Sequence, residues 1–237
     1  TGQWYGYKTA NRLYVTQEEL IAMQSQTATG ARQFYRSTSE SVGDIIFMDL
    51  NGDGVITIAD RTYLGSAEPK ATGGFGGTVM FKNLYCNLTF AYAFGHTRLW
   101  NLPRNSFASS DYNLSNLIAG KSASILSPYE ATMPRVTPYG TGANNTFSDF
   151  FLHDASYVRL SAFNLTYRIP GKAFGNSFLQ GLDITFQATN LLTFTRYPGL
   201  DPQGNWSNAR FGTGMGVDNS EFPNAKNYNL GFKFTIK

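Results

Sequence analysis

The chain has 237 residues, a formal net charge of +3 and a single cysteine, Cys86, which together exclude a disulfide framework and a cysteine-rich zinc site and give no reason to expect nucleic-acid binding. Charged residues make up 15% of the chain, below the roughly 25% usual in soluble domains, and aromatic residues also reach 15%. No apolar run approaches the roughly 18 residues of a membrane helix, which excludes a helical membrane protein but not a barrel of short, half-apolar strands.

The N-terminal third is predicted to hold a short strand and a short helix. The segment GQWYGYK has the composition of a strand. In the following segment, TQEELIAMQSQ, Thr16 and Glu19 have the spacing of a capping box, and Leu20, Ile21 and Met23 supply apolar positions. This pattern predicts a helix.

Residues 49–60, DLNGDGVITIAD, match the twelve-position pattern of calcium-binding loops. Gly54 stands at position 6, where the chain must turn sharply, and Asp60 replaces the usual glutamate at position 12. We expect a structural divalent-cation site, with calcium as the ion. The alternative is a solvated turn that binds nothing. The expected ligands are Asp49, Asn51, Asp53, the Val55 carbonyl, Thr57 and Asp60.

Four later segments alternate apolar and polar residues with the period of β-strands. Val158 and Leu160 have the opposite parity to the residues that follow them, so a bulge or a change of face is expected near Ser161. The apolar sets are Cys86, Leu88, Phe90, Tyr92 and Phe94; Phe163, Leu165, Tyr167 and Ile169; Leu182, Ile184, Phe186, Ala188 and Leu192; and Tyr228, Leu230, Phe232, Phe234 and Ile236.

Two structures fit this alternation. In a soluble sandwich the apolar faces of two sheets meet, whereas in an outer-membrane barrel the apolar face meets lipid and the polar face lines the lumen. The connections at 81–84 and 170–181 are short or moderate, and those at about 98–150 and 197–225 are long and rich in Gly, Ser, Asn and Pro. Short connections that alternate with long ones favour the barrel.

Aromatic residues in the long connections are candidate contacts to a ligand, with ordinary loop packing as the alternative for each. No nucleophile elbow is present, and no spacing favours a catalytic pair of carboxylates, so an enzyme is not expected. The candidate contact residues are Trp100, Tyr112, Tyr129, Tyr139 and Trp206.

Several segments resemble the SusC/RagA-like family of TonB-dependent outer-membrane transporters. GDIIFMDLNGDGVITIADRTYLGSAEPKATGGFGG does so through Asp60-Arg61, Gly65 and Pro69-Lys70. YGYKTANRLYVTQEEL, DASYVRLSAFNLTYRIP and ATNLLTFTRYPGLDP are similar to further family segments in the same order. The resemblance covers the chain except for roughly residues 99–150.

The resemblance implies an all-β fold in which residues 1–237 are the C-terminal antiparallel strands of a 22-stranded transmembrane barrel, with long extracellular loops and short periplasmic turns. It implies part of an importer of oligomeric nutrients, either glycans or peptides. The implied partners are the remaining N-terminal barrel and plug polypeptide, a SusD-like surface lipoprotein, TonB through the plug, and outer-membrane lipid. Polar residues such as Asn87, Arg168 and Gln187 are candidates to line the transport path, with hydrogen-bonded polarity of the barrel wall as the favoured alternative. The alternative function is a soluble, calcium-stabilised extracellular β-domain that binds carbohydrate.

Overall fold

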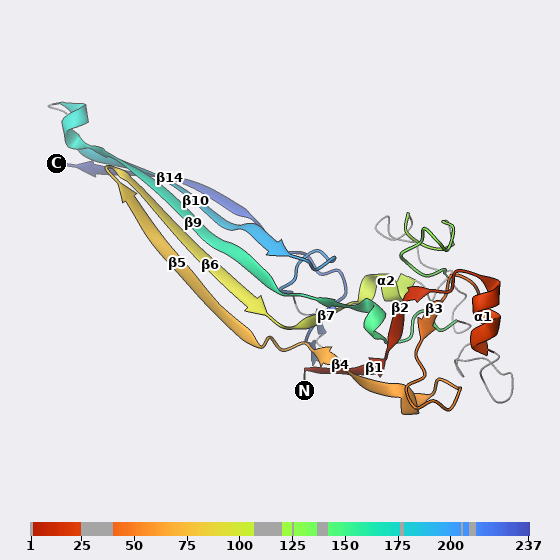
Figure 1. The fold of residues 1–237 in the computed structure, drawn as a ribbon. Coiled ribbons are helices and arrows are strands. Elements are labelled where there is room, and N and C mark those ends of the chain that lie inside the picture. The colour runs from red at the N-terminus through yellow and green to blue at the C-terminus, as the bar shows by residue number, and fades with distance from the viewer. Residues whose placement is uncertain are drawn as a thin grey trace. The chain divides into compact units, whose positions relative to one another are not determined.

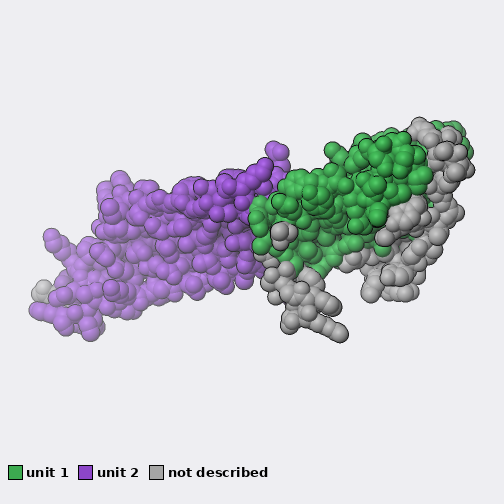
Figure 2. Space-filling model, turned by 90° about the horizontal axis from the view of Figure 1, so that it is seen from below, with its two compact units in different colours: residues 1–68, 97–153, 205–221 green, residues 69–96, 154–204, 222–237 purple. Residues whose placement is uncertain are grey.

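The computed structural model describes residues 2–24, 40–106, 120–124, 126–136, 142–175, 178–204, 206–208 and 212–237. Most regular elements are strands in antiparallel pairs, as the sequence predicts (Figure 1). The chain divides into two units, and each is built from three separate stretches of sequence (Figure 2). Unit 1 comprises residues 1–68, 97–153 and 205–221, and unit 2 comprises residues 69–96, 154–204 and 222–237. Within the described ranges, the longest helices are too short and too polar to cross a membrane.

Unit 2 is one five-stranded antiparallel sheet with the strand order β14-β10-β9-β6-β5 (Figure 1). The other sheets of the described chain are formed by residues of unit 1, apart from the last residue of β8. Among the described residues, unit 2 therefore contains this one sheet alone, apart from the last residue of β8. Its strands are β5 (Ala71–Phe81), β6 (Leu84–Phe94), β9 (Tyr157–Pro170), β10 (Leu179–Thr195) and β14 (Asn227–Ile236).

The register of this sheet sorts apolar and polar side chains onto opposite faces. On the apolar face, Ile184 pairs with Tyr167 on one side and with Phe232 on the other. Apolar side chains of the edge strand β14 are open to the surroundings, with Leu230 63% and Phe232 56% exposed. These exposures contradict the sandwich, in which the same side chains would be buried.

The opposite face carries rows of hydrogen-bonding side chains. Asn87, Asn164, Gln187 and Asn229 are partners in register across four neighbouring strands. In the row next to them, the hydroxyls of Thr166 and Thr185 lie 3.0 Å apart. Further along, the Arg168 guanidinium donates to the Asp183 carboxylate at 2.9 Å. Cross-strand pairs of this kind stabilise the sheet without apolar burial on this face.

The expected irregularity near Ser161 is confirmed. Thr89 of β6 pairs with Ala162, but the next residue, Phe90, pairs with Leu160, so Ser161 is an extra residue in β9. Because of this extra residue, Leu160 lies on the same apolar face as Phe163, although their positions in the sequence have opposite parity. The bulge also sends the intervening Arg159 to the polar face.

The connections of unit 2 differ in length at its two ends. Only Lys82 and Asn83 separate β5 from β6, and a short 3-10 helix η3 (Gly171–Phe174) lies between β9 and β10. At the opposite end, β6 leads into residues 97–153 and β10 into the chain before β14. These longer connections carry short elements of their own. They are β7 (Thr97–Trp100), α2 (Asn101–Ser106), η2 (Asp149–Phe151), β8 (Leu152–Asp154), β11 (Trp206–Asn208), β12 (Gly212–Gly214) and β13 (Val217–Asp218).

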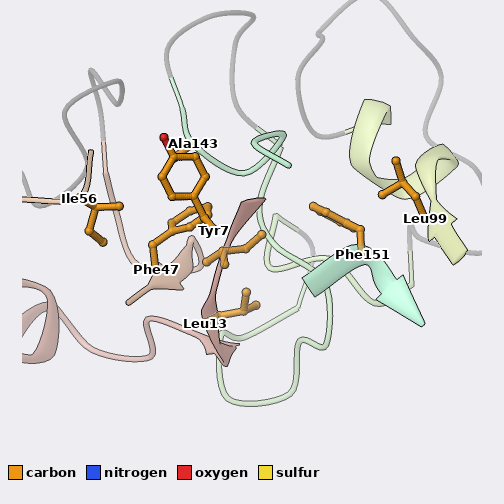
Figure 3. Packing of buried hydrophobic residues seen from close by; sticks show 8 residues of the cluster. Tyr7, Leu13, Phe47, Ile56, Leu99, Ala143 and Phe151 are labelled. Atoms are coloured by element: carbon orange, nitrogen blue, oxygen red, sulfur yellow. The ribbon is translucent and has the colours of Figure 1, made fainter. Parts of the chain in front are cut away.

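Unit 1 joins the two connections to the N-terminal part of the chain. Its first strands form two antiparallel pairs, β1 with β4 and β2 with β3. Side chains from all three regions, including Tyr7, Phe47, Leu99 and Phe151, pack into one apolar core (Figure 3). The N-terminal elements are β1 (Gln3–Tyr7), β2 (Thr9–Leu13), α1 (Gln17–Gln24), β3 (Ile45–Phe47), η1 (Ile58–Asp60) and β4 (Arg61–Ser66).

The predicted helix forms as α1, and its N-terminus is capped almost as the sequence suggests. The Thr16 hydroxyl accepts a hydrogen bond from the Glu19 N–H at 3.1 Å. The Glu19 carboxylate accepts from the Val15 N–H at 3.1 Å, one residue before the donor that a capping box would use. The helix start is therefore held by both predicted side chains.

A buried polar network stiffens unit 1 beside its core. The Arg135 guanidinium forms an ion pair with the Asp44 carboxylate at 2.7 Å. The Asn144 side chain donates to the same carboxylate at 2.7 Å and accepts from the Ile45 N–H at 3.0 Å. The network pairs these polar groups and connects β3 to Arg135 and Asn144.

Candidate functional site

The acidic loop, residues 49–60, follows β3 and is closed mainly by its own backbone N–H groups. The Asp49 carboxylate accepts from the Gly52 and Gly54 N–H groups, both at 2.7 Å. The exposed side chains of Asn51 and Asp53 bond to each other at 2.9 Å. Gly54 has a φ of 84°, which explains why glycine is needed at the sharp turn.

Asp60, the last residue of the loop, is fully buried and holds the two ends of the loop together. One carboxylate oxygen accepts from the Leu50 N–H at 2.9 Å and from the Asn51 N–H at 3.3 Å, and the other accepts from the Thr57 N–H at 2.7 Å. Burial alone would raise the pKa of Asp60, but these donors outweigh it and hold the pKa below its usual value. Asp60 therefore stays ionised, and its carboxylate joins the start of the loop to its end.

The fit of the loop to a cation is partial. Ile56 is completely buried and anchors the loop to the core, as expected for a site attached to a rigid base. Across the described residues, however, no three His, Cys, Asp or Glu side chains are arranged as a group that could hold a metal. The carboxylates of Asp49, Asp53 and Asp60 all accept backbone N–H groups of the loop itself.

The candidate aromatic contacts lie in different surroundings. Trp100 is 5% exposed, and its ring packs edge-on against His153 with 5.7 Å between centroids. Tyr129 is 73% exposed and borders a cleft of unit 1. Tyr112, Tyr139 and the side chain of Trp206 fall outside the described residues; the backbone of Trp206 belongs to β11.

The cleft beside Tyr129 is mainly apolar and has a volume of about 430 Å³. Burial lowers the pKa of His153, which lines the cleft and is therefore uncharged at neutral pH. The charged residue of the lining, Arg12, is paired with Glu19. Its remaining lining residues are Asn11, Leu13, Val15, Pro128, Ala131, Thr132, Met133 and Phe150.

One polar centre of unit 2 was missed by the sequence reasoning. Arg159 is buried on the polar face, where it pairs with the Asp201 carboxylate at 2.5 Å and donates to Thr193 and Gln203. The second oxygen of Asp201 accepts from the Asn224 N–H at 2.9 Å. The centre therefore ties the chain on both sides of residues 205–221 to β9.

The sequence holds only a partial signal for this centre. Arg159 lies in DASYVRL and Asp201 lies in YPGLDP, two of the segments that carry the family resemblance. The longer segments also contain Asp154 and Arg196, so charge alone does not identify the pair. Alternation analysis passed over both residues because it scores apolar positions.

The comparisons with known proteins point in one direction, although no protein-family model matches the chain. TonB-dependent receptor P3 of Formosa agariphila is 32% identical over 196 residues, which cover 80% of this chain. TonB-dependent receptor P26 of the same organism is 28% identical over 205 residues, or 82% of this chain. The matches cover 18% and 20% of those receptors, so the chain spans about a fifth of their length.

Solved structures of RagAB share the fold. The RagAB peptide transporter superposes on 98% of this chain with a TM-score of 0.64 at 20% identity, and covers it with 22% of its own length. The RagAB peptide importer in its closed-closed state gives a TM-score of 0.63 at 22% identity over 98% of this chain, again with 22% of its own length. The relatives are named as receptors and transporters, not enzymes. The chain therefore belongs to the SusC/RagA-like family of TonB-dependent receptors of the outer membrane and spans about a fifth of the length of the receptors that it matches.

Proposed function

We propose that the chain forms part of the barrel wall and the external loops of an outer-membrane importer of oligomeric nutrients. The observation that carries the proposal is the sheet of unit 2, which sorts apolar and polar side chains onto opposite faces and has no second sheet stacked on it within the described chain. In a membrane barrel the apolar face meets lipid and the polar rows line the lumen. The TonB-dependent receptors among the relatives support the same function.

The open edges of the sheet support the existence of further barrel strands. Among the described residues, β5 and β14 each have a partner strand on one side only. In hydrocarbon, each unpaired backbone group at such an edge costs several kcal/mol, so additional strands of the receptor must pair with both edges. We infer that residues 1–237 as a whole act with a remaining barrel and plug polypeptide, through which TonB supplies the driving force.

The short and long connections define an orientation. We propose that the turn at Lys82-Asn83 and the η3 connection face the periplasm, and that the long connections at about 98–150 and 197–225 face outward. Unit 1, which contains most of these connections, would then meet the nutrient and a SusD-like surface lipoprotein. The nutrient is an oligopeptide or an oligosaccharide, and Tyr129 beside its cleft is a candidate contact.

Capture of the full-length receptor from detergent-extracted outer membranes tests this function. We expect mass spectrometry to recover a SusD-like lipoprotein with the tagged receptor, and deletion of the receptor gene to abolish growth on the oligomer that is its nutrient. A matched strain that carries the receptor gene on a plasmid should recover growth. Recovery of the protein in the aqueous fraction would contradict the importer and favour the soluble carbohydrate-binding domain.

We also propose that the acidic loop binds Ca²⁺ as a structural ion. The support is the exposed turn on which Asp49, Asn51 and Asp53 present side-chain oxygens, followed by the Val55 carbonyl and Thr57 at the spacing of a calcium loop. Carboxylate and carbonyl oxygens are the ligands that calcium prefers. The buried Asp60 would close the loop from position 12.

Replacing both Asp49 and Asp53 by alanine is expected to abolish calcium binding, because these residues supply two of the three carboxylates of the expected ligand set. Elemental analysis of the purified full-length receptor measures the bound ion. The matched control is Glu68→Ala, which removes an exposed carboxylate of unit 1 outside the loop. Equal calcium content in the double variant and the wild type would refute the site.

A further inference from the structure

A second cleft of unit 1 is bordered by β1, the start of β4 and the end of α2, and has a volume of about 350 Å³. Two arginines, Arg61 and Arg104, line it together with Gly6, Tyr7, Asn145 and Phe147, and we name it the arginine cleft. No acidic side chain is among its described lining residues. The volume is at the lower end of the range of small-molecule sites.

Arg104 is held rigidly but lacks a counter-ion. Its Nε donates to the Asn145 carbonyl at 2.7 Å, and its Nη1 donates to the Asn101 side-chain oxygen at 3.0 Å. The side chain is half-buried, and burial lowers the pKa of Arg104 from its ordinary value. Among the described residues no carboxylate pairs with it, so its desolvated charge is only partly compensated.

Arg61 adds a second cation to the cleft. Its guanidinium lies over the buried Tyr7 ring, 5.2 Å from the ring centroid, and this stacking fixes the plane of the group. Within the described chain it also has no carboxylate partner. The contrast with other arginines is clear, because Arg12, Arg135, Arg159 and Arg168 each pair with an acidic residue.

One wall of the cleft is set by close packing. A Cβ added at Gly6 would lie 2.5 Å from Cδ1 of Phe147, so glycine at this position allows the phenyl ring to stand against β1. The Phe147 ring in turn packs against Trp4 with 5.7 Å between centroids. The cleft therefore combines two oriented guanidinium groups with a fixed aromatic wall.

We propose that the arginine cleft binds a carboxylate group of a soluble ligand. Guanidinium groups recognise carboxylates through paired N–H donors, and an anion between Arg61 and Arg104 would neutralise two charges that the described chain leaves without counter-ions. Where the importer function holds, this carboxylate belongs to the transported oligomer, either an acidic peptide or a uronate sugar. The binding itself does not depend on transport.

Calorimetry on the full-length receptor in detergent tests the proposal with two pairs of probes. The first pair is triglutamate and triglutamine amide, and the second is an oligoglucuronate and a neutral oligoglucose of equal length. We expect one acidic probe to bind and its neutral counterpart to bind at least roughly tenfold more weakly, because a charge-assisted contact is lost. The acidic probe that binds identifies the source of the carboxylate.

Variants connect this binding to the cleft. Arg61→Gln and Arg104→Gln are each expected to weaken the acidic probe roughly tenfold. Arg61→Lys keeps the charge but loses the paired N–H donors and the stacking over Tyr7, so it is expected to retain only part of the affinity. The matched control is Lys121→Gln, which removes one exposed charge of unit 1 away from the cleft lining and should leave affinity unchanged. If Arg104→Gln does not fold, the affinity of the variants at the exposed Arg61 still tests whether the cleft binds the carboxylate.

Unchanged affinity in Arg61→Gln, or equal binding of acidic and neutral probes, would overturn the proposal. Calorimetry needs no TonB, so the failures of the two proposals can be told apart. Carboxylate binding without uptake in cells would count against the importer alone. Uptake without carboxylate-dependent binding would count against the arginine cleft alone.

Discussion

Replacing Leu230 by arginine is expected to destabilise the folded receptor by about 2–4 kcal/mol, the cost of a cation on the lipid face near the bilayer midplane. Leu230 lies in the middle of β14, pairs with Phe186 and is 63% exposed on the apolar face. In a barrel this exposed leucine contacts lipid, and arginine would have to leave the hydrocarbon or bring water into it. Denaturant unfolding in lipid vesicles measures the effect.

The matched control is the neighbouring residue. Asn229 pairs with Gln187 on the polar face, so Asn229→Arg places the same cation on the lumen side of the same strand. We expect that variant to fold and to insert nearly as well as the wild type. Equal destabilisation by the two substitutions would contradict the assignment of one face to lipid and the other to the lumen. Greater destabilisation by Asn229→Arg would reverse that assignment.

Replacing Arg159 by methionine is expected to cost about 3–5 kcal/mol, because it leaves the Asp201 carboxylate buried without its cation. The Arg159 and Asp201 side chains are 4% and 10% exposed, so water cannot readily take the place of the guanidinium. The loss should release the segment around Asn224, whose N–H bonds to Asp201. Thermal unfolding and protease cleavage of the full-length receptor measure both effects.

Two further variants distinguish the stability lost by leaving a buried carboxylate unpaired from the stability lost by removing any arginine charge. Arg168→Gln breaks the ion pair with Asp183, in which the arginine side chain is 56% exposed, and should change stability little. The double variant Arg159→Met, Asp201→Leu removes both buried charges and should recover part of the lost stability. Similar melting temperatures for Arg159→Met and Arg168→Gln would show that the buried pair is not a structural centre.

The strands could be predicted because their signal is local. Alternation of apolar and polar residues places Phe186 and Leu230 on one face regardless of which strands become neighbours. The break in parity at Leu160 similarly predicted a bulge or a change of face near Ser161, and the structure has a bulge there. The partners of each strand could not be read from alternation, because pairing depends on chain topology.

The site residues were harder to predict because their roles depend on distant contacts. The side chain of Asp60 reads as a cation ligand in sequence, but in the structure it accepts N–H groups from both ends of its own loop. Trp100 stands in a polar connection yet is buried beside His153. Arg61 and Arg104 meet in one cleft although 42 residues of chain, including the β5–β6 hairpin, lie between them.

The discontinuous core of unit 1 has a consequence for the order of folding. Tyr7 and Phe47 precede the β5–β6 hairpin in the chain, whereas Leu99 and Phe151 follow it. Early closure of that hairpin, which needs only a two-residue turn, would shorten the effective chain between the two halves of the core and lower the entropic cost of joining them. Formation of the β5–β6 hairpin would therefore precede, and speed, the assembly of the unit 1 core.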